Sequence, residues 1–167
     1  RVVATAEDWA SNQTQSPEAA GAGSAFTFDQ TSPVAVITLP GADVAQNSLT
    51  MVTGTASDNM ELDSIWVRLY NQGADQYWNN TSQNFTIAPA LRETAWYVSS
   101  ATLNNWTVWN ATFTFVNETT YRVEAKARDK AANFDTVTST RTFLYDTVAA
   151  QSFVGLPANA SAINSLA

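Results

Sequence analysis

Side chains that can bind hard metal ions occur at three places in the chain. Asp58 and Asn59 adjoin in the segment SDN, Asp129 and Asn133 enclose the segment DKAAN, and Asp29 stands further upstream. Carboxylate and amide oxygens are the ligands that Ca²⁺ prefers, and the ion takes six to eight of them in irregular geometry. Asp and Asn are also turn formers that bond their own backbone, and Asp58 and Asp129 could have that role alone. A calcium site requires a fold that brings the three segments together.

Composition excludes several other kinds of chemistry. The 167 residues include no Cys and no His, which excludes thiol nucleophiles, His-based triads and His/Cys zinc sites. There is no phosphate-binding Gly loop and no nucleophile elbow. The net charge of −7, without a run of Lys or Arg, argues against nucleic acid as a partner, and no apolar stretch is long enough to span a bilayer. We therefore expect neither an enzyme nor a membrane-inserted segment.

A second set of candidate residues is the N-x-S/T acceptors of N-glycosylation. Eight such triplets are present, whereas the Asn, Ser and Thr content predicts about three by chance. The excess indicates covalent N-glycans and therefore an exported protein. The alternative is that a surface rich in Ser, Thr and Asn forms such triplets without modification. The acceptors are Asn12, Asn79, Asn80, Asn84, Asn105, Asn110, Asn117 and Asn159. The triplets of Asn79 and Asn80 overlap, so we expect a glycan on only one of these two residues.

Aromatic residues form a third group, because exposed Trp and Tyr rings can stack on sugars. The candidates for such stacking are Tyr77, Trp78, Trp96 and Trp106, and Tyr97 and Trp109 complete the cluster. Aromatic residues are also enriched in strands and dominate the cores of β-sandwiches. We favour this structural role over sugar binding.

Alternation of apolar and polar residues dominates from residue 33 to residue 145, with turn residues between the runs, and this predicts an all-β fold. No helical period of useful length occurs, and about seven short strands imply an Ig-like sandwich of two sheets. The expected strands are 34–39, 48–56, 63–71, 84–87, 95–98, 106–116, 120–129 and 135–146.

In such a sandwich, the loop after the second strand and the loop before the last strand lie at the pole where the chain enters. This connectivity brings Asp58 and Asn59 close to Asp129 and Asn133, with Asp29 in the entering linker. The sequence therefore predicts a Ca²⁺ site at this pole. Asp146 is expected to begin the equivalent site at the next junction.

The chain also repeats itself. LPGADVAQNSL at 39–49 matches LPANASAINSL at 156–166 in six of eleven positions, at a spacing of 117 residues. RVVATAEDWASN at 1–12 matches RVEAKARDKAAN at 122–133 in seven of twelve positions, at a spacing of 121. Long-period self-similarity is the signature of tandem units. We expect the last strands of one unit at 1–30, a complete unit at 31–146 and the first strand of another at 147–167.

Several motifs resemble the tandem Ig-like domains of large prokaryotic cell-surface proteins. They include VTGTASDN (52–59), SIWVRLY (64–70), YWNNTS (77–82), TYRVEAKARDKAAN (120–133) and YDTV (145–148). Tyr121 stands where such folds often place a tyrosine corner, two residues before Val123, although an ordinary buried Tyr is the alternative. Family members usually have Gly where this chain has Ser11 and Ala132, and Pro at Ala149 or Ala150. The resemblance implies a fold and an architecture and does not imply a ligand.

Together these features predict an extracellular structural protein whose partners are neighbouring repeats or copies of itself. It would build a stalk, adhesin shaft, surface layer or filament, and abundant acceptors favour an archaeal cell surface over a bacterial one. A first alternative is a filament subunit whose incomplete ends pair with the next chain by strand addition. A second alternative is a carbohydrate-binding module that uses the Trp cluster.

Overall fold

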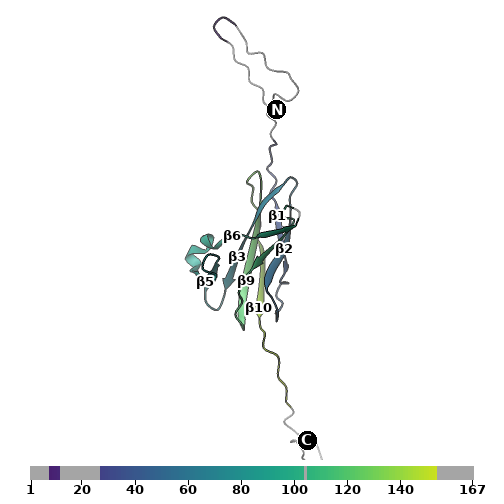
Figure 1. Cartoon of the computed structure of the whole chain (residues 1–167), viewed down its shortest axis with the longest axis vertical. Helices are drawn as coiled ribbons and strands as arrows, with labels where there is room; N and C mark the ends of the chain where they lie inside the picture. The colour runs from purple at the N-terminus through teal and green to yellow at the C-terminus, as the bar shows by residue number, and fades with distance from the viewer. Residues whose placement is uncertain (1–7, 12–26, 104, 154–167) are drawn as a thin grey trace, which may run out of the picture.

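The first sheet of the structure, a computed structural model, has four antiparallel strands. The structure describes residues 8–11, 27–103 and 105–153. The strands run in the order β1 (Val34–Leu39), β2 (Met51–Ser57), β8 (Val108–Thr112) and β7 (Ser100–Leu103). Figure 1 labels β1 and β2 of this sheet. This is the A-B-E-D order of an immunoglobulin-type sandwich.

The second sheet packs face to face on the first. Its order is β10 (Ser139–Tyr145), β9 (Thr119–Asp129), β3 (Leu62–Asn71), β4 (Gln76–Asn79) and β5 (Asn84–Ile87). Strand β6 (Tyr97–Val98) pairs with β3 beside this path. The order begins G-F-C and continues with two further edge strands, as in variable-type domains. The predicted all-β, Ig-like sandwich is confirmed.

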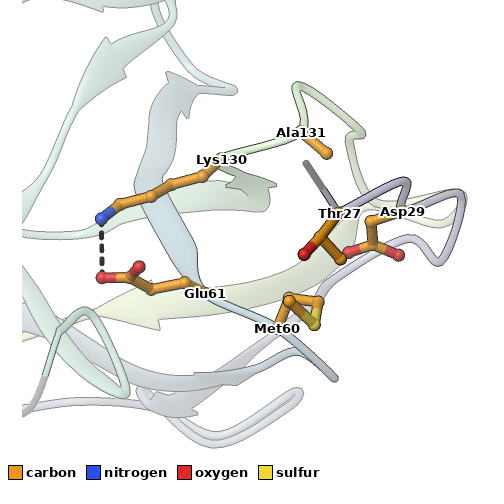
Figure 2. A pocket seen from close by; sticks show the side chains of 6 residues that line it. All are labelled: Thr27, Asp29, Met60, Glu61, Lys130 and Ala131. Carbon is orange, nitrogen blue, oxygen red and sulfur yellow. Dashed lines mark ion pairs between the residues drawn. The ribbon is translucent and has the colours of Figure 1, made fainter. Parts of the chain in front are cut away.

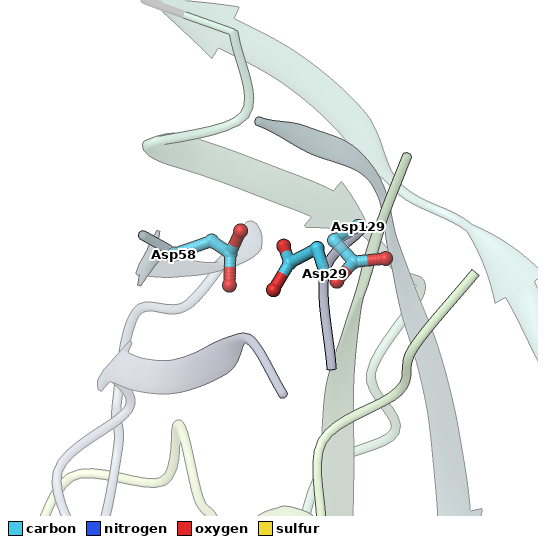
Figure 3. A group of neighbouring side chains, drawn as sticks. All are labelled: Asp29, Asp58 and Asp129. Atoms are coloured by element: carbon cyan, nitrogen blue, oxygen red, sulfur yellow. The ribbon is translucent and has the colours of Figure 1, made fainter. Parts of the chain in front are cut away.

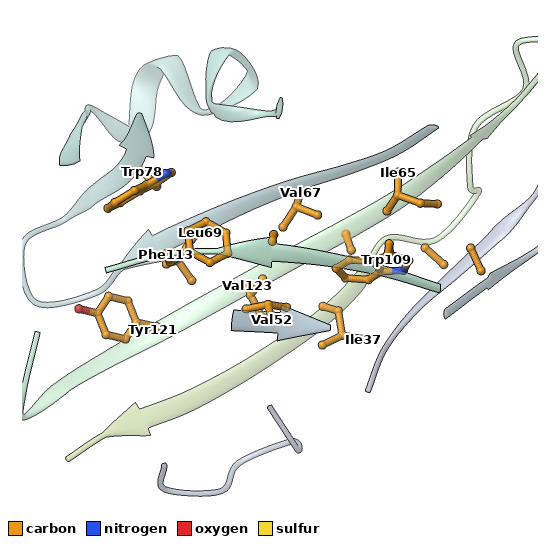
Figure 4. Packing of buried hydrophobic residues seen from close by; sticks show 14 of the residues in the cluster. Ile37, Val52, Ile65, Val67, Leu69, Trp78, Trp109, Phe113, Tyr121 and Val123 are labelled. Atoms are coloured by element: carbon orange, nitrogen blue, oxygen red, sulfur yellow. The ribbon is translucent and has the colours of Figure 1, made fainter. Parts of the chain in front are cut away.

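The core lies between the two sheets and follows the predicted alternation (Figure 4). On β3, Ile65, Val67 and Leu69 are fully buried, and they pair with the buried face of β9. The first sheet contributes Val52 and the ring of Trp109, both at 0% exposure. Two closely packed apolar faces of this kind supply most of the stability of a sandwich, at about 25 cal/mol for each Å² of apolar surface buried.

The expected tyrosine corner is present at the start of β9. The Tyr121 hydroxyl accepts a hydrogen bond of 2.8 Å from the backbone N–H of Val116, five residues upstream. Tyr121 is fully buried and its ring packs against Phe115 and Phe143. The bond fixes the connection between β8 and β9, so Tyr121 has the corner role and is more than an ordinary core residue.

Some element boundaries differ from those expected. Strands β4 and β7 were not predicted, because they are short and have no clear alternation. The expected strand 95–98 begins inside a 3₁₀ helix, η1 (Pro89–Ala95), and contributes only β6. The expected strands 48–56, 106–116 and 135–146 correspond to the shorter strands β2, β8 and β10, and β2 starts three residues later than expected and ends one residue later. The ten strands of the described residues all lie within the complete unit expected at 31–146, whereas the flanking units expected at 1–30 and 147–167 fall largely outside the described residues.

The helix η1 covers part of the outer face of the second sheet. Arg68 points outward from β3, yet it is only 8% exposed because η1 and Trp96 lie over it. Its guanidinium donates to Glu124 at 2.7 and 3.1 Å, to Glu93 at 3.0 Å and to the carbonyl oxygen of Arg92 at 3.2 Å. A buried charge is tolerated when its donors are satisfied in this way. Arg68 therefore anchors η1 to the sheet.

The entering and leaving segments emerge at opposite ends of the sandwich (Figure 1). Residues 43–46 run parallel to β10, with Gln46 N–H donating to Leu144 O at 2.8 Å and Asp146 N–H donating to Gln46 O at 2.9 Å. Side chains attach β1 to the second sheet, since Ile37 N–H donates to Ser139 Oγ on β10 at 3.1 Å, and Ala35 N–H donates to Asp135 Oδ2 in the loop before β10 at 2.9 Å. The segment from β1 to residue 46 therefore contacts both sheets. Residues 43–46 cover part of the edge of β10 that would otherwise be open to another strand.

Gly54 on β2 is required by the packing of Trp109. A Cβ placed at Gly54 would overlap the Trp109 ring and the carbonyl oxygen of Val36. We predict that Gly54→Ala lowers the free energy of unfolding by about 1–3 kcal/mol, because the core must shift to accept the methyl group. Urea unfolding followed by Trp fluorescence measures the change. In the control Gly73→Ala, the new Cβ meets Asn71 Oδ1 at an ordinary 3.5 Å, so a change within about 0.5 kcal/mol is expected. Equal losses in both variants would contradict the proposed role of Gly54.

Candidate functional site

Three carboxylates meet at the pole where the chain enters the sandwich (Figure 3). Asp29 comes from the entering segment, Asp58 follows β2, and Asp129 is the last residue of β9. One oxygen from each lies within 4.8 Å of the others. Asp129 is 1% exposed, and the other two are partly buried. The three segments therefore converge as the sequence predicted, in an arrangement that could hold a cation.

The turn-forming role of these residues is also present: it uses one oxygen each of Asp29 and Asp58, and Asn133 donates to both oxygens of Asp129. Asp58 Oδ2 accepts from Met60 N–H at 2.9 Å, and Asp29 Oδ1 accepts from Thr31 N–H at 2.9 Å. The second oxygens, Asp29 Oδ2 and Asp58 Oδ1, are buried and have no hydrogen-bond partner. Burying an unpaired carboxylate oxygen is costly, so turn formation alone does not account for the arrangement.

The two asparagines predicted as ligands, Asn59 and Asn133, donate hydrogen bonds to the carboxylates. Asn133 Nδ2 donates to Asp129 Oδ2 at 2.8 Å and to the carbonyl oxygens of Asp29 and Thr31 at 3.2 and 3.3 Å. Asn59 Nδ2 donates to Asp29 Oδ1 at 3.4 Å. Both amides contact the cluster through Nδ2. Asn133 also connects the entering segment to the turn after β9.

Lys130, which follows Asp129 in the chain, is paired with Glu61. A cleft of about 200 Å³ is lined by Asp29, Glu61 and Lys130 among others, and Lys130 Nζ lies 2.6 Å from a carboxylate oxygen of Glu61. Figure 2 shows this ion pair and the residues around it. Within the part of the chain that the structure describes, no ion pair involves Asp29, Asp58 or Asp129. Three carboxylates close together repel one another unless a cation balances them. Ca²⁺ fits this donor set, and carboxylates that bind through one or both oxygens would supply three to six of its ligands.

Asp146, which the sequence predicts to begin the equivalent site at the next junction, directly follows β10. Its Oδ1 accepts from Val148 N–H at 2.9 Å, which repeats the bond between Asp29 Oδ1 and Thr31 N–H. The two aspartates are separated by the 117-residue spacing of the repeat. The chain thus forms the same local turn on entering and on leaving the domain.

A second pair of turns shows the same equivalence. The N–H of Ser11 donates to Asp8 O at 3.0 Å, and the N–H of Ala132 donates to Asp129 O at 3.2 Å. Ser11 and Ala132 have positive φ values of 61° and 72°. Glycine is the residue best suited to such a backbone, so both turns carry a residue other than Gly at a position that favours Gly.

The exposed N-x-S/T acceptors are Asn80, Asn84 and Asn105. Asn79, Asn110 and Asn117 are half-buried, and Asn110 lies opposite the core-facing neighbours on β8 as predicted. Asn117 Oδ1 accepts from the N–H and hydroxyl of Thr147 at 2.6 and 3.0 Å, so this side chain also fixes the leaving segment. Asn12 and Asn159 lie outside the described residues.

Most of the aromatic cluster is structural. Tyr77 and Trp78 are 3% and 1% exposed, so neither offers an open ring face for stacking on a sugar. Trp109 is fully buried, and Trp106 and Tyr97 pack against the core. Trp96 lies 4.3 Å from the guanidinium of Arg68 and 4.4 Å from Lys126 Nζ, measured to its ring centroid. The ring of Trp96 thus stabilises the covered outer face of the sheet.

No protein-family model matches the chain, and no characterised protein matches it in sequence. Among solved structures, CopC from Methylosinus trichosporium OB3b is 8% identical, with a TM-score of 0.44 over 68% of this chain and 94% of that one. An engineered protein is 17% identical, with a TM-score of 0.40 over 68% of this chain and 20% of that one. Neither likeness is close enough to support an inference about function. No helix in the described residues is long and apolar enough to cross a membrane.

A substitution at Ala132 tests whether the turn that carries Asp129 has a strained backbone. We predict that Ala132→Gly raises the free energy of unfolding by about 0.5–1 kcal/mol, because Gly adopts positive φ without the steric cost of a Cβ. In the control Ala131→Gly, the replaced residue has no positive φ, and a loss of about 0.4–1 kcal/mol is expected. Chemical denaturation measures both changes. A loss of stability in Ala132→Gly would show that the turn does not have this backbone.

Proposed function

We propose that residues 31–146 form a calcium-stabilised spacer unit in a tandem array of Ig-like domains at the cell surface. The observation that carries the proposal is the convergence of Asp29, Asp58 and Asp129 with two buried carboxylate oxygens that have no partner. Asp29 belongs to the linker, and the other two belong to the domain. A cation held by all three would fix the direction in which the linker enters.

The hydrogen bonds around the cluster support this mechanical role. Asn133 already connects the entering backbone to Asp129, so the linker approaches the site in a defined geometry. In a tandem array each unit contacts chiefly its neighbours, and stiffness therefore depends on how each linker is held. A bound Ca²⁺ would replace repulsion among three carboxylates with attraction to one ion.

Three further observations suit an extended array. The linkers leave from opposite ends of the sandwich (Figure 1). Both Asp-based turns recur at the repeat spacing, at Asp29 and Asp146 and at Asp8 and Asp129. Exposed acceptors on the sides of the domain would carry N-glycans. The proposed partners are therefore neighbouring repeats or further copies of this chain.

The first test is the thermal stability of the chain in Ca²⁺ and in EGTA. At free Ca²⁺ of about one hundred times Kd, binding adds about 2.7 kcal/mol, which raises Tm by about 10 °C for a domain of this size. Asp58→Asn keeps an acceptor for Met60 N–H, but it should abolish this increase. In EGTA the Tm of the same variant should equal or exceed that of the wild type, because one repelling charge has been removed.

Asp43→Asn is the matched control, since Asp43 is exposed and is not part of the cluster. It should keep the full Ca²⁺ response. Equal Tm values in Ca²⁺ and EGTA for the wild type would overturn the calcium proposal, and so would an unchanged response in Asp58→Asn.

The second test concerns export and glycosylation. Mass spectrometry of proteolytic peptides from the native protein should find glycans at Asn80, Asn84 and Asn105, which are exposed. Occupancy should be lower at half-buried Asn110 and Asn117, because the modifying enzyme reaches their side chains less easily. Unmodified peptides at all three exposed acceptors would contradict the proposed glycoprotein.

A further inference from the structure

A second cleft lies on the side of the second sheet, and none of Asp29, Asp58 and Asp129 lines it. It has a volume of about 420 Å³ and is formed by β4, the end of β5 and the segment from Thr94 to Tyr97. Small-molecule sites commonly measure about 300–1,000 Å³. None of its lining residues is charged, which disfavours phosphate, sulfate or carboxylate ligands. Arg68 anchors η1 nearby and does not line the cleft.

Two residues that line this cleft, Trp78 and Tyr97, each have a buried polar atom without a hydrogen-bond partner. Trp78 is 1% exposed, and its Nε1 has no acceptor. The Tyr97 hydroxyl is also buried and unpaired. A tyrosine hydroxyl is protonated at neutral pH, and burial raises the pKa of Tyr97 further. Native proteins rarely leave such groups unsatisfied, and a ligand or ordered water normally pairs with them.

The rest of the lining adds weaker polar groups and apolar surface. Asn79, Asn80 and Thr94 supply amides and a hydroxyl, while Ile87 and Trp96 supply apolar contact. Fixed donors, neutral amides and an aromatic wall suit an uncharged ring that carries many acceptor oxygens. We propose that this cleft binds a neutral sugar residue whose oxygens accept from Trp78 Nε1–H and the Tyr97 hydroxyl.

The sugar has two possible sources with the same chemistry. Asn79 and Asn80 are N-x-S/T acceptors and line the cleft, so a glycan on one of them begins at its rim. The other source is a saccharide from solution or from a neighbouring chain. The site differs from sugar stacking on exposed rings, because its specificity comes from buried donors. It is also independent of the proposed calcium site.

The first experiment uses unglycosylated chain produced in a bacterial host. N-acetylglucosamine, glucose and mannose are titrated separately while the six Trp indole N–H signals are followed by ¹H–¹⁵N NMR. We expect a saturable shift of the Trp78 signal, assigned from triple-resonance spectra. Tyr97→Phe should weaken binding about fivefold to tenfold, the effect of one hydrogen bond. The control Tyr145→Phe should not, because Tyr145 does not line the cleft.

Tyr97→Phe also has a readout without sugar. Removing a buried hydroxyl that has no partner should leave Tm unchanged or raise it. The Tm without sugar thus checks the folding of the Tyr97→Phe variant separately from its sugar binding. A lower Tm without sugar would show that the hydroxyl has a protein partner, and it would overturn the proposal.

The second experiment uses the chain with a single glycan at Asn80. If that glycan fills the cleft, the Trp78 signal is shifted before any sugar is added, and free sugar causes no further change. Tyr97→Phe then lowers Tm in the glycosylated chain alone. If free sugar still binds, the source is external. If neither free nor attached sugar moves the Trp78 signal, the cleft holds water only and the proposal is wrong.

Discussion

The register between β3 and β9 determines where almost every other feature of the molecule lies. The two strands pair from Leu62 opposite Asp129 to Asn71 opposite Tyr121. In this register Ile65, Val67 and Leu69 face the first sheet together with alternate residues of β9. A slip of one residue would turn these side chains toward solvent and would bring Arg68 into the core. The apolar alternation on both strands therefore fixes a single pairing.

The same register places a functional feature at each end of the strand pair. At one end, Lys130 N–H donates to Glu61 O at 3.0 Å and closes the turn that carries Asp129 toward Asp58. At the other end, Tyr121 bonds to Val116 and fixes the connection from the first sheet. The hydrophobic pairing of β3 and β9 stabilises the domain enough to hold carboxylates close together. This explains how a group of like charges can be maintained before any cation binds.

The sequence could predict those features that depend on periodicity and connectivity. The alternation of Ile65, Val67 and Leu69 indicates a core strand, and the order of strands brings Asp58 and Asp129 to one pole. It could not show which carboxylate oxygens lack partners, since that depends on the Nδ2 contacts of Asn59 and Asn133. The burial of Arg68 was also not predictable, because it depends on η1 folding over the outer face. Trp78 and Tyr97 are separated by eighteen residues, and only that folding places them in one cleft.

A unit in an extended array needs interactions at its ends and little tendency to pair along its sides. In the described part of this chain, the covered sheet edges limit pairing along the sides, and the Asp-based turns lie at the ends. Residues 43–46 cover part of the β10 edge, and side chains connect β1 to the second sheet, so fewer backbone groups are open to strand addition. The Asp-based turns stand at the two poles, where the linkers enter and leave. If Ca²⁺ joins a linker to its domain at one pole, the covered edges make end-to-end contact the favoured mode of association. The proposed sugar site on the side of the sheet then provides a separate contact that does not alter the spacing of the units.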